Sequence, residues 1–253
     1  MDIRFAVPVT EQSYINDFAD RSFRDLADQD YIAARVSYRL EMDLLFLWNS
    51  LQAIEKYLKA ILLYNGKSTK GIGHDLHKAL TRVRSIPDIA FQFPADVLEF
   101  ISYVDQQGTN RYFCHPMYLT DRALLKLDKT IWHVRRYCQY LRADYPTLEG
   151  GWVCGLTKEL ERIHNPHYAS NPYRFRVSRG FLEDAIAKNK PSSQYLIWNN
   201  LYYARRKRKH ITFRDRMGSA NPTHFINVGI FPRLANLVDF PRGVREAFNR
   251  DAG

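Results

Sequence analysis

The sequence predicts an all-α protein: an antiparallel helical bundle with a mainly helical, loop-rich and basic C-terminal extension. Apolar residues repeat every three or four positions in several segments before residue 143, which is the helical period. Short polar loops join these segments, which favours antiparallel neighbours. This half shows no alternating apolar and polar pattern of the kind that strands produce. We therefore expect a bundle at 14–143, a linker at 144–151 and a basic, aromatic-rich region at 150–253.

The clearest helix covers residues 43–64, and Asn65-Gly66 follows it directly. Both of these residues tolerate the left-handed conformation that ends many helices. The preceding helix is expected to begin at Asp30, whose carboxylate can accept a hydrogen bond from a first-turn N–H. The apolar side of the 43–64 helix consists of Leu44, Leu47, Trp48, Leu51, Ile54, Leu58, Ile61 and Leu62.

Three further helices complete the predicted bundle. Asp75 is placed to cap one that follows a glycine-rich linker, and another fits residues 94–105. The last covers 120–142, where Thr120 and Asp121 provide a start signal.

The C-terminal region is expected to hold shorter helices at 156–164 and 181–188. A longer helix is expected over 194–209, with Ser192 or Ser193 as its N-cap. Residues 211–253 contain three prolines but also many apolar side chains, so we expect them to pack on the body of the protein.

Composition excludes several classes of protein. No run approaches the roughly 20 apolar residues that a membrane-spanning helix needs. The N-terminal sequence lacks the charged and apolar regions of a secretory signal. The three cysteines have no paired spacing, which favours reduced thiols and a cytoplasmic protein. His74 and His77 have no third ligand at suitable spacing, so we expect no metal and no cofactor.

Positive charge is concentrated in the second half of the chain. Residues 144–253 hold 18 Lys and Arg against 10 Asp and Glu, so this half carries +8 of the total +10. The densest cluster is Arg205 to His210, in which Arg205, Arg206, Arg208 and Lys209 are candidate phosphate-binding residues. Such a cluster fits a nucleic acid, with RNA preferred over DNA. The alternative is that these residues form an ordinary solvated basic surface that binds no nucleic acid.

Glu55 is a polar residue on the apolar face of the 43–64 helix. A carboxylate in that position is costly unless an ion pair or hydrogen bonds satisfy it. The candidate partners are Arg35 and Arg39 on the preceding helix and Arg111 in a later loop. Such an ion pair would fix the register of the bundle, and the alternative is an electrostatic support behind a functional site.

The order Glu55-Lys56-x-x-Lys59-Ala60, followed by a His74-Asp75-Leu76 helix start, resembles the HEPN family over about residues 14–142. That family consists of small helical-bundle proteins from nucleotide- and RNA-related systems in prokaryotes. The resemblance implies a HEPN-like bundle, a homodimer, and a role in a stress or defence system.

HEPN ribonucleases carry an Arg, four to six further residues and then a His. In such a site the His handles the reacting proton and the Arg stabilises the charge on the phosphate, and neither role needs a metal. This chain departs from that pattern, because only three residues separate Arg111 from His115 and Tyr112 replaces the usual small polar residue. Arg111-Tyr112 resembles the family branch that is thought to bind nucleotides. Arg205 and His210 have the right spacing but lie outside the bundle, in a run too basic for the match to carry weight.

Three hypotheses follow. The leading one is a non-catalytic protein that binds nucleotide or RNA through Arg111, Tyr112 and the Arg205–His210 cluster. The second is a metal-independent endoribonuclease of the toxin or antiviral type, with Arg111 and His115 as catalytic residues. The third is a dimeric interaction scaffold that has a partner protein.

Overall fold

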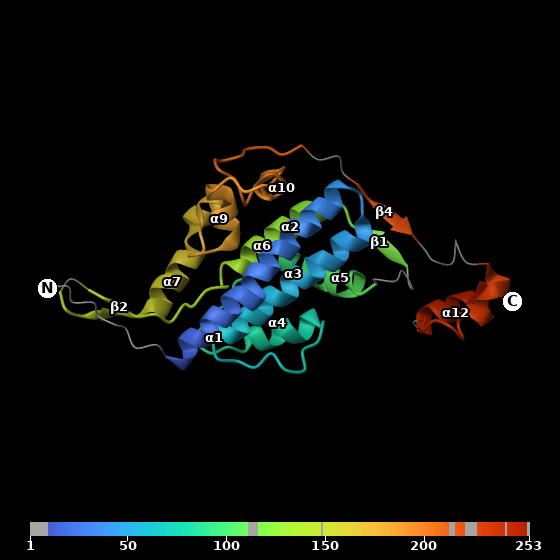
Figure 1. Ribbon diagram of the computed structural model, residues 1–253, viewed down its shortest axis with the longest axis horizontal. Coiled ribbons are helices and arrows are strands. Elements are labelled where there is room, and N and C mark those ends of the chain that lie inside the picture. Colours follow the sequence, from blue (N-terminus) through green and yellow to red (C-terminus); the bar gives the residue numbers. More distant parts are fainter. Residues whose placement is uncertain are drawn as a thin grey trace.

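The computed structural model describes residues 10–110, 116–147, 149–212, 216–220, 227–240 and 242–251. They form a mostly helical protein, which confirms the predicted fold class. Figure 1 shows long helices side by side, with the C-terminal segments in orange along one flank and those in red at the far end. No helix in these ranges is long and apolar enough to cross a membrane.

The first long helix begins well before the predicted start. It runs through α1 (Glu11–Ala19), a π-helical turn (Asp20–Arg24) and α2 (Asp25–Arg39) without a break. Thr10 is its N-cap and accepts a 3.2 Å hydrogen bond from the backbone N–H of Ser13. Asp30 is therefore not a cap: it lies inside α2 and its carboxylate pairs with Lys56 on the next helix.

Helix α3 (Asp43–Tyr64) has the predicted bounds and lies at the centre of the bundle. It ends at Asn65, and Gly66 adopts the left-handed φ of +63° that ends the helix. Gly108 lies at the end of a later helix, α5 (Ala95–Gly108), and its missing side chain allows α5 to come unusually close to α3. A Cβ atom on Gly108 would lie 2.7 Å from Cβ of Leu51, so a larger residue there would push the helices apart.

The remaining bundle helices follow the prediction with shifted ends. Asp75 caps α4 (Leu76–Arg84) through a 2.7 Å bond from the backbone N–H of Lys78. Helix α5 (Ala95–Gly108) extends three residues further than expected. Helix α6 (Ala123–Arg135) is shorter than expected at both ends. Its start is delayed because Arg122 has a left-handed φ of +48°.

Two short sheets were not predicted. Strand β1 (Met117–Leu119) pairs antiparallel with β4 (Gly218–Ala220). Strand β2 (Tyr145–Pro146), inside the predicted linker, pairs antiparallel with β3 (Trp152–Val153), just after it. Strands of two or three residues are too short to show alternation in a sequence. The first pairing links the segment after α5 to the C-terminal region.

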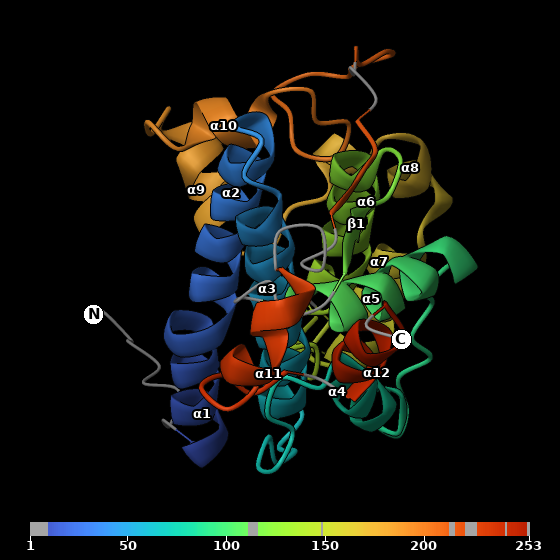
Figure 2. The ribbon, with the colours of Figure 1, turned by 90° about the vertical axis from the view of Figure 1, so that its right-hand side faces the viewer.

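The C-terminal region packs on the bundle through residues 155–204, and Arg216 and β4 contact it again further on. It contains α7 (Gly155–His164), α8 (Pro166–Ser170), a short 3₁₀ turn, α9 (Phe181–Ala187) and α10 (Ser193–Ile197). Both views show α9 and α10 beside α2 (Figures 1 and 2). One hydrophobic core joins them to the bundle, and its C-terminal members are Ile163, Phe175, Val177, Leu182, Ile186, Leu196 and Tyr203.

The predicted helix over 194–209 is wrong, because α10 ends at Ile197. The cause is the buried side chain of Asn200, whose Oδ1 accepts from the backbone N–H groups of Tyr202 and Tyr203. Its Nδ2 donates to the carbonyl of Leu196 at 2.9 Å. An asparagine side chain thus replaces the backbone bonds that would continue the helix.

The last helices form a small cluster of their own. Helix α11 (Phe231–Leu234) and α12 (Arg242–Asp251) bury Phe231, Val244 and Phe248 against one another, separately from the main core. Figure 1 places α12 away from the bundle. The expectation that 211–253 packs on the body therefore holds for β4 but not for these two helices.

Candidate functional site

The predicted catalytic pair cannot be placed, since Arg111, Tyr112 and His115 lie outside the described residues. Their neighbours are described: α5 ends just before them and β1 follows them. The hypothesis that Arg111 and His115 act on one phosphate therefore stays a prediction.

The other predicted residues lie in the Arg205–His210 segment, which we call the basic cluster. It has irregular backbone and is exposed, and Arg205 is tied to Oδ1 of Asn189. None of its cations pairs with a carboxylate within the described ranges. The cluster borders a cavity of about 630 Å³ that is lined by Ile197, Arg205, Arg206, Lys207, Arg208 and His210.

Within the described residues, Glu55 pairs with neither Arg35 nor Arg39, and its third predicted partner, Arg111, lies outside them. The buried carboxylate of Glu55 pairs with Lys59 one turn later and lies 2.7 Å from Nδ1 of His74. Lys59 also donates to the carbonyl of Gly73 at 2.9 Å. The two short patterns that carried the family resemblance therefore meet in space, and they fasten the start of α4 to α3.

Arg35 and Arg39 serve the C-terminal region instead of Glu55. Arg35 pairs with buried Asp128 on α6 and donates to the carbonyls of Tyr195 and Trp198. Arg39 lies over the rings of those same two residues, at 5.9 and 5.2 Å from the ring centroids. The expected pairing with Glu55 was wrong for Arg35, because Asp128 from α6 already neutralises its charge.

A second buried arginine makes an equivalent connection. Arg135 donates to both carboxylate oxygens of Asp28 at 2.7 and 2.8 Å, and to both oxygens of Glu183 at 2.7 Å. Burial opposes the charge on Arg135, but Asp28 and Glu183 outweigh it and hold its pKa well above the usual value. We call Asp28, Arg35, Asp128, Arg135 and Glu183 the arginine joint.

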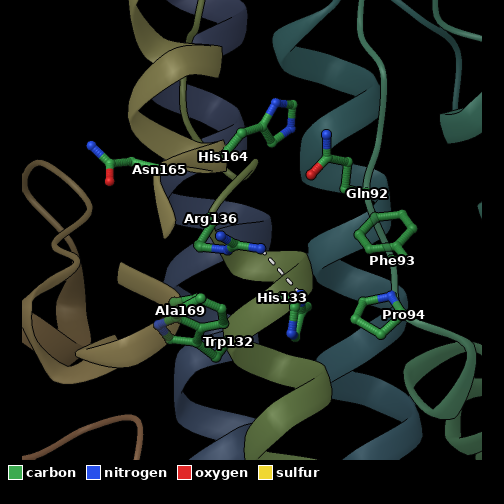
Figure 3. Close-up of a pocket in the computed structure, with 9 residues that line it drawn as sticks. All are labelled: Gln92, Phe93, Pro94, Trp132, His133, Arg136, His164, Asn165 and Ala169. Atoms are coloured by element: carbon green, nitrogen blue, oxygen red, sulfur yellow. Dashed lines mark hydrogen bonds between the residues drawn. The ribbon is translucent and has the colours of Figure 1, made fainter. Parts of the chain in front are cut away.

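Sequence reasoning missed a pocket of about 260 Å³ that lies between α6, the end of α7 and the loop before α5. We call it the Arg136 pocket. Figure 3 shows Arg136 between His164 and His133, with Gln92, Phe93 and Pro94 on the opposite side. The remaining lining residues are Trp132, Asn165 and Ala169.

Arg136 is buried, and no carboxylate of the described residues pairs with it. Its Nη1 donates to the carbonyl of Ile163 at 2.5 Å, and its guanidinium lies 3.9 Å from the ring centroid of Trp132. Its Nη2 lies 3.1 Å from Nδ1 of His133, while Nε has no partner. Burial lowers the pKa of Arg136 to about 10, so it still carries a full charge at neutral pH.

The two histidines of the pocket are held neutral. Burial lowers the pKa of His133 to about 3, and the nearby charges of Arg136 and Lys129 add to that effect. Because a guanidinium only donates, Nδ1 of His133 accepts from Arg136. Burial and the charge of Arg136 also lower the pKa of His164, whose Nε2 lies 2.9 Å from Oη of Tyr137.

Comparison with known protein families adds one finding: residues 21–113 match the family model of the HEPN domain. The matched segment lies within the helical bundle. The chain matches no curated protein and no solved structure. The HEPN domain supports a function associated with nucleotides or RNA.

The HEPN match covers the bundle from the π-helical turn to just beyond α5. It includes the Glu55–His74 contact, and it includes Arg111 and Tyr112 but not His115. The Arg136 pocket and the basic cluster both lie largely or wholly beyond it. In the sequence, the one signal for the pocket was a His and an Arg three residues apart on α6, which share a helical face.

Proposed function

We propose that this HEPN-domain protein binds single-stranded RNA through the basic cluster, and that it binds RNA without cleaving it. The observation that carries the proposal is a set of exposed cations around one cavity, without carboxylate partners in the described part of the chain. Paired surface arginines would have less attraction left for phosphate. The HEPN domain makes RNA the preferred polyanion.

The physical expectation is binding that depends strongly on salt. Phosphate contacts release condensed counterions from the nucleic acid, so the affinity falls as salt rises. The cavity is lined mainly by Arg and Lys side chains, which match a phosphate backbone of any sequence. Binding should therefore be nearly independent of sequence.

The test uses Arg206→Gln, Arg208→Gln and Lys209→Gln combined, which leaves the Arg205–Asn189 contact intact. Fluorescence anisotropy with a labelled single-stranded RNA, repeated over a range of KCl concentrations, should show at least a tenfold loss of affinity. Losing three contacts should also reduce the slope of log affinity against log salt by about 2.

A matched control removes the same charge elsewhere. Lys70→Gln, Lys78→Gln and Arg84→Gln combined change three exposed cations on or near α4. This control should bind RNA like the wild type. Equal losses in both triple variants would show that only net charge matters, and would contradict a site at the basic cluster.

Cleavage is measured in the same preparation by incubating total RNA with the protein in EDTA. We expect intact RNA. Metal-free cleavage that disappears in an Arg111→Ala/His115→Ala variant would instead establish the endoribonuclease hypothesis. The homodimer that the family resemblance implies is checked by light scattering on the same sample.

A further inference from the structure

We propose that the Arg136 pocket is a binding site for a small phosphomonoester, with Arg136 as the cation that receives the phosphate. The proposal does not depend on RNA binding at the basic cluster. It rests on a buried guanidinium that has no carboxylate partner in the described segments, and on a cavity of about 260 Å³ that this side chain lines.

The first argument is charge balance. Arg24, Arg35 and Arg135 are also buried, and each of them pairs with at least one carboxylate. Arg136 is 6% exposed, yet no Asp or Glu of the described segments lies within ion-pair distance of it. An unpaired buried cation is costly, so the position favours an anionic ligand as the missing partner.

The second argument is the supply of donors. A guanidinium has five N–H groups. Nη1 and Nη2 of Arg136 each use one N–H on Ile163 and His133, which leaves the second N–H of each for a ligand, whereas Nε is buried away from the cavity. The lining residues supply no Asp or Glu that would repel an anion. A guanidinium that faces no competing carboxylate is a strong receptor for phosphate oxygens.

His164 adds a further donor. Oη of Tyr137 accepts from the backbone N–H of Gln92 at 3.0 Å, so its own proton is free to go to Nε2 of His164. Neutral His164 then carries its proton on Nδ1, for which no bond is recorded in the described structure. Arg136 and His164, from segments far apart in sequence, thus line one cavity (Figure 3).

The third argument is the shape and polarity of the remaining wall. Phe93, Pro94 and Trp132 form an apolar side opposite and below the donors. A bare inorganic anion would leave this side empty, whereas a phosphate ester carries an organic group that can fill it. The pocket therefore favours a phosphomonoester over free phosphate.

The experiment is isothermal titration calorimetry of the full chain with inorganic phosphate and with phenyl phosphate, at constant ionic strength maintained with KCl. We expect phenyl phosphate to bind at least tenfold more tightly than inorganic phosphate. Arg136→Met should lower the affinity for phenyl phosphate at least tenfold. The Arg206/Arg208/Lys209 triple variant should bind phenyl phosphate like the wild type, which separates this site from the basic cluster.

A second variant tests the pocket independently, in case Arg136→Met fails to fold. Ala169→Trp fills the exposed rim of the pocket from α8 and leaves Arg136 in place. It should also abolish binding. Wild-type protein that binds neither probe, or an Ala169→Trp variant that binds phenyl phosphate normally, would overturn the proposal.

The phosphate could belong to a free metabolite or to the end of an RNA. One RNA oligonucleotide with either a 5′-phosphate or a 5′-hydroxyl distinguishes these sources. A preference for the 5′-phosphate that Arg136→Met removes assigns the pocket to RNA ends. Binding of phenyl phosphate without such a preference assigns it to a small ester.

Discussion

The arginine joint and the Arg136 pocket place cations at similar depth, but they treat them in opposite ways. In the joint, Arg135 meets two carboxylates and Arg35 meets one. In the pocket, Arg136 meets a carbonyl, a neutral imidazole and an indole ring. Adjacent residues of one sequence, Arg135 and Arg136, therefore point into two different electrostatic environments.

The difference shows which region is built for stability. A buried ion pair balances its own desolvation cost, and breaking it leaves a bare charge inside the protein. A buried cation without an anion carries that cost from the start. The joint holds the C-terminal region on the bundle. The pocket contains a buried cation that an anionic ligand can neutralise.

The largest effect is expected for Arg135→Met. It leaves buried Asp28 and half-buried Glu183 without their cation, so the free energy of unfolding should fall by about 3–5 kcal/mol. Urea denaturation followed by circular dichroism measures it. A loss below about 1 kcal/mol would contradict the assignment of Arg135 to the stability of the joint.

A smaller effect is expected from pH through His133. Its native pKa is about 3 against about 6.5 in the unfolded chain, so the unfolded state binds more protons between these values. Stability should therefore fall as pH falls below 6.5, by roughly 1–2 kcal/mol between pH 7 and pH 5. Urea denaturation at each pH tests this.

The control for that prediction is His133→Asn, whose side-chain oxygen can still accept from Arg136. It removes the titrating group and should flatten the stability profile over this range. A profile with the same slope in both proteins would assign the pH dependence to other groups.

The smallest effect is expected for Arg136→Met without ligand. Because no carboxylate loses its partner, the change should leave the free energy of unfolding within about 1 kcal/mol of the wild type or raise it. The same urea measurement applies. A loss as large as that of Arg135→Met would remove the contrast between the two regions.

The sequence predicted best where signals were local. The bounds of α3 were right because its apolar residues repeat densely and Asn65-Gly66 ends it. The Asp75 cap was right for the same reason, since its partner Lys78 is three residues away. The start at Asp30 was wrong because α1 carries many polar residues and buries only Ala19, while its contacts with α3 still keep it helical.

Predictions that depended on distant partners failed. The partners of Glu55 were sought on the preceding helix, but His74 reaches it from a loop and Asp128 takes Arg35. The helix over 194–209 was predicted from propensity, and the side chain of Asn200 ended it. The Arg136 pocket could not be predicted, because three segments far apart in sequence build it.

The arginine joint also has a consequence for how the chain folds while it is being synthesised. Domains generally fold from the N-terminal side during synthesis. Asp28 and Arg135 can meet as soon as α6 has been made, but Glu183 and the carbonyls that Arg35 binds are added well after the HEPN match has ended. In the nascent bundle, Arg35 and Arg135 therefore lack some of their partners until a segment beyond the HEPN match has been synthesised.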